Sequence, residues 1–152
     1  MTILARSRWI ILHAVAALAK YQPPLIIVNL GTALVFDAAR DYLGGAIAPG
    51  INIAAQALFN RAAMLRRVSI ERPSTDSVIG KNTVHAIQSG FYGYADMIQG
   101  MVRRFRSEIG EDATIIATGG YAPILMDEID CIDHVEPDLN LEGLRLVYEA
   151  NR

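Results

Sequence analysis

The sequence from Val28 to Asp37 reads Val-Asn-Leu-Gly-Thr-Ala-Leu-Val-Phe-Asp, and it predicts two strands joined by a tight turn. An apolar run that begins at Leu25 leads into Gly31-Thr32, and a second apolar run follows at once. The backbone amides of such a turn and the threonine hydroxyl can meet a phosphate oxygen. An isolated hairpin of this kind is common, so its meaning depends on the segments that accompany it.

The rest of the chain alternates between helical and extended patterns, without an internal repeat or a long linker. Proline pairs and glycines mark the ends of the elements. In the first half we expect a helix at 8–20 within a leading segment of residues 1–22, then strands at 25–29, 33–37 and 44–48, and a helix from 51 onward that buries one face. A loop follows at 67–79, with a short extended piece at 68–70. In the second half we expect one long helix at 84–109, a strand at 114–117, a helix at 122–128, a strand at 132–135 and a closing helix at 141–150.

The long helix carries three internal glycines, Gly90, Gly93 and Gly100. Each glycine destabilises a helix interior by about 1 kcal/mol relative to alanine. Two explanations remain open: the helix backbone approaches a partner or ligand closely at these positions, or the helix is kinked or broken.

The expected order of elements is βββαβα, which gives an α/β fold with a mixed sheet flanked by helices. This order is similar to that of the ribonuclease H-like half-domain shared by actin, hexokinases and Hsp70 chaperones. A length of 152 residues fits a single domain, residues 1–152.

Composition excludes several classes of partner. The net charge is −2 and the pI is about 5.9, so no basic field attracts nucleic acid or an anionic membrane. The apolar run from Trp9 to Ala19 is shorter than the roughly 20 residues that a bilayer crossing needs. The single cysteine, Cys131, cannot form an internal disulfide, and we expect it to be a packing residue in a cytoplasmic protein.

Seven short segments carry a family resemblance. They are Asn29 to Ala33, Gly44-Gly45-Ala46-Ile47-Ala48-Pro49-Gly50, Ile79-Gly80-Lys81-Asn82-Thr83, Gln88-Ser89-Gly90, Tyr92-Gly93-Tyr94, Ala117-Thr118-Gly119-Gly120 and Asp138-Leu139-Asn140-Leu141-Glu142-Gly143-Leu144. With these segments in this order, the chain resembles the type III pantothenate kinases, bacterial enzymes that transfer the ATP γ-phosphate to pantothenate in the first step of coenzyme A synthesis. The resemblance implies ATP, Mg²⁺ and a monovalent cation (K⁺ or NH₄⁺) as cofactors, and a homodimer.

The resemblance covers only the C-terminal half of such a kinase. No segment matches the N-terminal Asp-x-Gly-Asn-Thr loop that holds the ATP phosphates and magnesium in the family. The family's Gly-Ala-Asp-Arg segment aligns with Ala5-Arg6-Ser7-Arg8, which puts Ser7 in place of the catalytic aspartate base. Asn29 stands where the family has an aspartate that binds the monovalent cation, and its amide oxygen remains a candidate metal ligand.

The resemblance also implies ligand contacts. Gly31 and Thr32 correspond to the ATP-binding turn, and Gly119 and Gly120 to the adenosine-side turn, although tight packing of a strand against a helix also explains these two glycines. Thr83 corresponds to a threonine that contacts pantothenate, although a threonine here can also be a helix cap.

Pantothenate contacts are further implied for residues near the N-terminus. Ala5, Arg6 and Arg8 belong to the aligned segment that precedes the first helix, and Arg8 corresponds to a substrate contact of the family.

Three hypotheses about function follow. The first is ATP-dependent phosphorylation of pantothenate to 4'-phosphopantothenate. We do not expect this reaction from the chain alone, because a serine hydroxyl cannot replace a carboxylate base. Loss of such a base typically slows a reaction by about 10² to 10⁴. In this case a separate N-terminal half could complete the enzyme. The second is a noncatalytic relative that acts as a binding or dimerisation module.

The third hypothesis, a nucleic-acid enzyme of the ribonuclease H class, conflicts with the charge and with the absence of carboxylates from the first strand. The acidic residues Asp127, Glu128, Asp130 and Asp133 are expected in a helix end and a loop. His13, His85 and His134 have no metal-ligand spacing.

Overall fold

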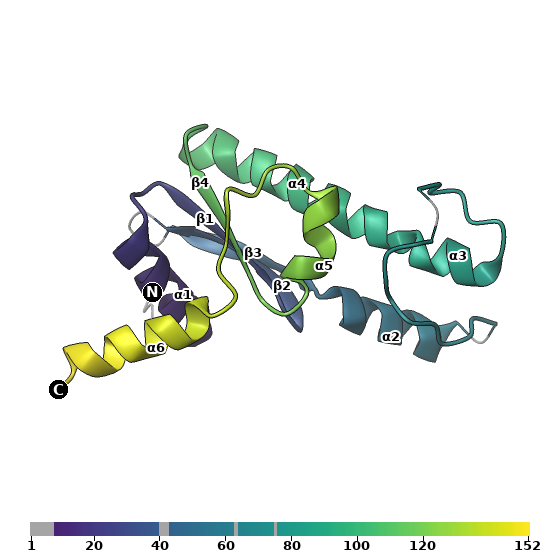
Figure 1. Cartoon of the computed structure of the whole chain (residues 1–152), viewed down its shortest axis with the longest axis horizontal. Helices are drawn as coiled ribbons and strands as arrows, with labels where there is room; N and C mark the ends of the chain where they lie inside the picture. The colour runs from purple at the N-terminus through teal and green to yellow at the C-terminus, as the bar shows by residue number, and fades with distance from the viewer. Residues whose placement is uncertain (1–7, 40–42, 63, 75) are drawn as a thin grey trace.

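A mixed sheet forms the centre of the protein (Figure 1). The computed structural model describes residues 8–39, 43–62, 64–74 and 76–152, with side chains from residue 11 onward. Within these ranges the sheet has five strands in the order β3-β2-β1-β4-β5. The strands are β1 (Leu25–Leu30), β2 (Ala33–Ala39), β3 (Gly44–Pro49), β4 (Thr114–Thr118) and β5 (His134–Val135). β1, β2 and β3 pair antiparallel, whereas β4 pairs parallel to both β1 and β5.

Helices cover both faces of the sheet. They are α1 (Arg8–Lys20), α2 (Ile51–Arg61), α3 (Thr83–Gln88), α4 (Gly90–Ile109), α5 (Ala122–Leu125), the 3₁₀ helix η2 (Met126–Glu128) and α6 (Leu139–Ala150). α1 packs on the sheet face of Leu25 and Ile27, while α4 and α5 pack on the face of Ile26 and Val28. In the described part of the chain no helix has the length and apolarity of a membrane span.

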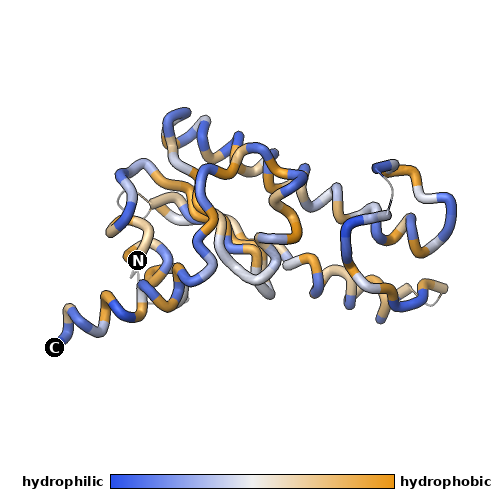
Figure 2. The backbone as a smooth tube through the Cα atoms, in the orientation of Figure 1, coloured by the Kyte–Doolittle hydropathy of each residue, from blue (hydrophilic) through white to orange (hydrophobic). Residues whose placement is uncertain are grey.

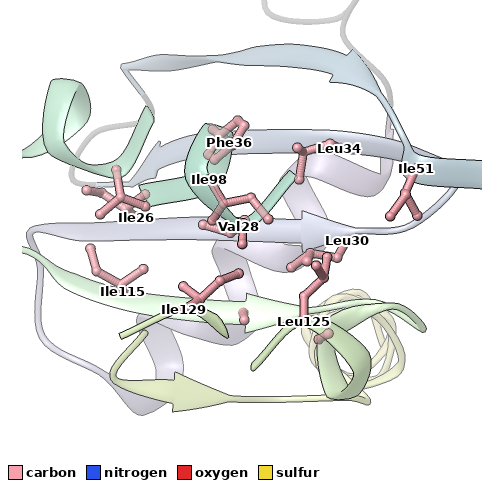
Figure 3. Packing of buried hydrophobic residues seen from close by; sticks show 14 of the residues in the cluster. Ile26, Val28, Leu30, Leu34, Phe36, Ile51, Ile98, Ile115, Leu125 and Ile129 are labelled. Atoms are coloured by element: carbon pink, nitrogen blue, oxygen red, sulfur yellow. The ribbon is translucent and has the colours of Figure 1, made fainter. Parts of the chain in front are cut away.

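β1 is the most deeply buried element. Leu25, Ile26, Ile27 and Val28 are each 0% exposed. Because successive side chains of a strand point to opposite faces, this continuous apolar run fits a strand that is covered on both sides. Figure 3 shows Ile26 and Val28 beside Ile98 of α4 on one of these faces.

The expected strands and the α/β class are confirmed, and several boundaries differ. β5 is limited to two residues, α6 begins at Leu139, and residues 68–70 form no strand. Cys131 is half-buried against the main core, as expected of a packing residue.

An arm extends beyond the sheet. It consists of α2, the loop 62–82, α3 and the first turns of α4, which lie together at one end of the molecule in Figure 1. The tube in Figure 2 shows hydrophobic residues recurring along α2, away from the sheet. Only Ile51 and Ala55 of α2 are buried, and Leu58 is 43% exposed. The expectation that this helix buries one face therefore holds at its start, at Ile51 and Ala55, and fails at Leu58.

The predicted long helix is two helices, interrupted at Ser89. The Ser89 hydroxyl donates to the carbonyl oxygen of His85 (2.9 Å), and Gly90 follows directly. Serine and glycine pairs are a common cause of helix kinks. A Cβ added at Gly90 or Gly93 would meet no atom within 4 Å, so the described chain supplies no close backbone approach there. The structure confirms an interruption of the helix, and Gly90 and Gly93 leave its backbone open at the surface.

α1 and α6 cross in close contact on their side of the sheet. A Cβ at Gly143 of α6 would lie 2.1 Å from the Leu12 carbonyl oxygen of α1. The end of α1 is also tied to the residue after β5, since Lys20 Nζ lies 2.8 Å from Glu136 Oε2 and the Tyr21 hydroxyl donates to Glu136 Oε1 (2.6 Å). The latter hydrogen bond raises the pKa of Tyr21 to about 12. Hydrogen bonds from Lys20 and Tyr21 lower the pKa of Glu136.

Substitution of Gly143 tests the helix crossing. Gly143→Ala should lower the free energy of unfolding by about 1 to 3 kcal/mol, because the added methyl group overlaps the backbone of α1. The matched control is Gly93→Ala, because Gly93 is a helical glycine in open space. This substitution should raise the free energy of unfolding by about 0.5 to 1 kcal/mol. Urea unfolding measures both. Equal effects of the two substitutions would contradict the close crossing.

Candidate functional site

Two turns lie side by side at one edge of the sheet. β1 and β4 run parallel, with Asn29 opposite Thr118, so the chain leaves both strands at the same edge. The turn after β1 contains Gly31-Thr32, and the turn after β4 contains Gly119-Gly120. The Tyr121 amide donates to the Leu30 carbonyl oxygen (3.0 Å), and this hydrogen bond joins the two turns. We call these two turns the turn pair.

The Asn29 side chain lies between the two turns. Its Oδ1 atom is 2.7 Å from the position of a Cβ on Gly119 and 3.2 Å from that of a Cβ on Gly31. Gly119 has φ +97° and would also bring a Cβ to 2.6 Å from the Leu30 carbonyl oxygen, so tight packing explains this glycine. Gly120 differs, since a Cβ there would meet nothing within 4 Å. Its backbone is therefore accessible to a ligand.

The start of α2 supports the Thr32 turn from a second side. The Gly50 amide donates to the Thr32 carbonyl oxygen (3.2 Å), where a Cβ on Gly50 would lie only 2.3 Å away. The Tyr94 hydroxyl donates to the Pro49 carbonyl oxygen (3.3 Å), and burial raises the pKa of Tyr94. The cavity beneath these residues has a volume of about 10 Å³, enough for at most one water. A nucleotide would have to bind on the outer side of the turn pair, where Thr32 is exposed.

Thr83 lines a different and larger hollow, which we call the Thr83 hollow. Its volume is about 930 Å³. The residues that line it come from the loop 62–82 and α3: Arg66, Ser74, Lys81, Asn82, Thr83, Val84, His85 and Gln88. The cationic side chains Arg66 and Lys81 make this lining suitable for an anionic ligand.

Thr83 is not the cap of α3. Asn82 is the N-cap, and its Oδ1 accepts a hydrogen bond from the His85 amide (2.9 Å). The helix-cap explanation for Thr83 is therefore wrong, and its exposed hydroxyl is available for another contact. Asparagine directly before the first helical residue is a signal from which the cap could have been identified in the sequence.

The structure brings some of the predicted residues together and separates others. Asn29, Gly31, Thr32, Gly119 and Gly120 all belong to the turn pair. None of them lines the Thr83 hollow, and α3 lies in the arm, away from α5, in Figure 1.

The predicted residues near the N-terminus are not placed. Ala5, Arg6 and Ser7 lie outside the described residues. Arg8 is the first residue of α1, but its side chain also lies outside the description.

The donor atoms suit a monovalent cation better than Mg²⁺. Asn29 Oδ1 and neighbouring backbone carbonyls are neutral oxygen ligands, whereas Mg²⁺ in such sites is usually held by one or two carboxylates together with substrate phosphates. Among the described residues no three His, Cys, Asp or Glu side chains gather as a metal site. The described residues therefore do not fit Mg²⁺ by themselves.

The acidic residues after α5 have partners within the protein. Glu128 forms an ion pair with Arg72 (2.9 Å). Asp133 accepts a hydrogen bond from the Ile115 amide (2.7 Å) and lies 3.7 Å from Arg106. Sequence reasoning had no signal for these pairs, because they join segments that are distant in the chain.

Comparisons with known proteins identify similar sequences. The family model of the type III pantothenate kinase matches residues 8–104. A protein named type III pantothenate kinase from an Exiguobacterium species is 51% identical over 146 residues, and one from Syntrophotalea carbinolica is 50% identical. Each alignment covers 93% of this chain and 56% of the relative. The chain thus spans about half the length of the curated relatives it matches.

Solved structures show a similar fold. A putative Baf family transcriptional activator from Campylobacter jejuni is 21% identical, with a TM-score of 0.63, and the match covers 99% of this chain and 67% of that one. Component A of the (R)-2-hydroxyglutaryl-CoA dehydratase of Acidaminococcus fermentans is 12% identical, with a TM-score of 0.51 over 89% of this chain and 64% of that one. These similarities concern the mixed α/β architecture alone.

Substitutions of the two adjacent glycines test the turn pair. Gly119→Ala should lower the free energy of unfolding by about 2 to 4 kcal/mol, because alanine is strained at this positive φ and overlaps Leu30 and Asn29. Gly120→Ala is the control and should change it by less than about 0.5 kcal/mol. Thermal and urea unfolding of both variants measure the difference. Similar losses at both positions would contradict the described geometry.

Proposed function

Because this chain belongs to the type III pantothenate kinase family, we propose that it carries the nucleotide-side turns and the pantothenate hollow of an enzyme that phosphorylates pantothenate to 4'-phosphopantothenate with ATP. The observation that carries the proposal is the convergence of Asn29, Gly31, Thr32, Gly119 and Gly120 at one edge of the sheet, from strands far apart in the sequence. The family match over residues 8–104 supports the same reaction.

The turn pair is the proposed ATP site. The exposed Thr32 hydroxyl and the open backbone at Gly120 offer hydrogen-bond donors to phosphate or ribose oxygens. Asn29 Oδ1 is the proposed ligand of a monovalent cation beside the phosphates. When bound, such a cation would offset phosphate charge, and the neutral amide should hold it more weakly than a carboxylate would.

The Thr83 hollow is the proposed pantothenate site. Pantothenate has a carboxylate at one end, which Arg66 and Lys81 complement in charge, and hydroxyl groups that Thr83 can hydrogen-bond. Ala5, Arg6 and Arg8 are proposed to contribute further contacts from outside the described geometry.

Phosphoryl transfer needs groups beyond these two regions. Ser7 replaces the family's aspartate base, and a serine hydroxyl cannot accept the substrate proton as a carboxylate does. No segment of the 152 residues matches the family's Asp-x-Gly-Asn-Thr phosphate loop. We therefore propose that turnover requires a second polypeptide segment that supplies this loop and its Mg²⁺ site. By its resemblance to the family, the enzyme is also proposed to work in the cytoplasm.

A homodimer is proposed through the arm. Apolar side chains exposed on α2, the loop 62–82 and α3 are Ile53, Leu58, Met64, Val78, Ile79 and Val84. An apolar groove of about 260 Å³ lies between α2 and the start of α4. Gly90 and Gly93 leave the α4 backbone open beside it. A second copy packed here would cover apolar surface that one chain leaves in water.

Separate calorimetric titrations with ATP and with pantothenate test the two sites. Thr83→Val should weaken pantothenate binding about 2- to 10-fold, the effect of one lost hydrogen bond, and leave ATP binding unchanged. Thr32→Val should do the reverse, so each variant is the control for the other. Failure of the unsubstituted chain to bind either ligand would favour a noncatalytic dimerisation module.

ADP-release assays should show no pantothenate-dependent turnover by the 152 residues alone.

Sedimentation at two protein concentrations tests the dimer. The chain should sediment as a discrete dimer, and Leu58→Asp should shift it toward monomer, because a charge on α2 cannot be buried in an apolar interface. Leu144→Asp, at an exposed leucine of α6, is the control and should leave the dimer intact. Open-ended association, or equal effects of the two substitutions, would contradict an interface on the arm.

A further inference from the structure

The loop 62–82 contains no helix or strand in its described residues, yet it supplies Arg66 and Ser74 to the wall of the Thr83 hollow. Several of its polar contacts stay within the arm. The Gln88 amide nitrogen donates to the Ser69 carbonyl oxygen (3.3 Å) and to Glu71 Oε1 (3.2 Å), and Arg67 donates to Asn60 Oδ1 (3.1 Å). These contacts join one part of the arm to another, so they do not fix the loop to the sheet.

Arg72 connects the loop to the body of the protein. Its Nη2 atom lies 2.9 Å from Glu128 Oε1, and its Nη1 atom lies 4.0 Å from Asp127 Oδ2. The Arg72 pKa is raised, first by the charge of Glu128 and also by a hydrogen bond with Tyr92 of α4. Ser74, which lines the hollow, follows Arg72 by two residues, and the buried Pro73 lies between them, so the position of this wall depends on where Arg72 and Pro73 are held.

Glu128 is a firm anchor. Its side chain is only 20% exposed, and its Oε1 atom is fully buried and accepts no hydrogen bond, so the charge of Arg72 at 2.9 Å is its described partner. It ends η2, whose neighbours Leu125 and Ile129 belong to the main core, and its backbone carbonyl oxygen accepts a hydrogen bond from Gln99 Nε2 (3.4 Å). A carboxylate oxygen buried in this way needs a cation, because an unpaired buried charge is strongly unfavourable. The other two acidic partners of Arg72 contribute little, because Asp76, at 3.6 Å, is 96% exposed and Asp127, at 4.0 Å, is 77% exposed.

We propose that Arg72 is a positioning residue for the pantothenate site, which holds the loop wall of the Thr83 hollow in place through its ion pair with Glu128. The proposal rests on the function proposed above for this hollow. Arg72 does not line the hollow, so it acts through Arg66 and Ser74 and not by contact with the ligand. Because η2 is fixed by the core, loss of the pair should displace the loop and leave the turn pair unchanged.

The first test is hydrogen exchange of the chain without ligand. Arg72→Met and Glu128→Gln should each make backbone amides in residues 64–82 exchange about tenfold faster, while amides of β1 and β4 keep their rates. The double variant should be no faster than either single variant, because both remove the same pair. Arg145→Met is the matched control, since Arg145 also pairs with two carboxylates, at 2.7 Å from Glu142 and from Glu149, but lies on α6. Unchanged exchange in the loop would overturn the proposal.

The second test is calorimetric titration of the same variants with pantothenate and with ATP. Arg72→Met should weaken pantothenate binding about tenfold and leave ATP binding unchanged, and Arg72→Lys should recover part of the loss. Equal weakening of both ligands, or no change in pantothenate affinity despite faster loop exchange, would overturn the positioning role. If the unsubstituted chain binds no pantothenate, the proposed function of the hollow fails, and the exchange experiment still decides whether Arg72 holds the loop.

Discussion

The parallel pairing of β1 with β4 is the constraint on which the described structure depends. Leu25 pairs with Thr114 and Asn29 with Thr118, so the chain that leaves the sheet after β3, through the arm and α4, must return to it beside β1. β1 is buried on both faces, and this burial supplies the apolar contacts that hold the pair together. The same pairing places the Gly31-Thr32 and Gly119-Gly120 turns beside each other. Stability of the core and assembly of the proposed ATP site therefore share one cause.

The central sheet could be predicted from the sequence because its signal is local. Leu25 to Val28 form an uninterrupted apolar run between Pro24 and the Gly31 turn, which leaves little choice but a buried strand. The break at Ser89 could not be located in the same way, because the apolar steps of three and four continue across it from Ile87 to Phe91. Hydrophobic periodicity reports which side of a helix is apolar, and it does not report a local change such as the hydrogen bond from the Tyr92 amide to the Ser89 carbonyl oxygen, only three residues back (3.2 Å).

The candidate site was predicted in part. Thr32 and the three glycines of the turn pair were singled out through their motifs, but the close approach of Asn29 and Gly119 joins segments distant in sequence and becomes visible only in the folded chain. At Thr83 a local sequence signal was misleading. A threonine before an apolar helix resembles a cap, yet Asn82 takes that role, because its carbonyl oxygen reaches the His85 amide. The pair of Arg72 with Glu128 had no sequence signal, since a charge in a loop pairs with whatever the fold brings near it.

The core and the proposed pantothenate hollow rely on different interactions. Strand β1 and its neighbours are held by buried apolar surface, whereas the wall of the Thr83 hollow belongs to a loop held mainly by polar contacts at Gln88 and Arg72, with Ile70 packed against the core. Local regions with few buried apolar contacts open at a lower free energy than the core does. Changes in the loop should therefore alter binding before they alter global unfolding. For the same reason, stability measurements alone would overlook the loop residues that are proposed to shape the pantothenate hollow.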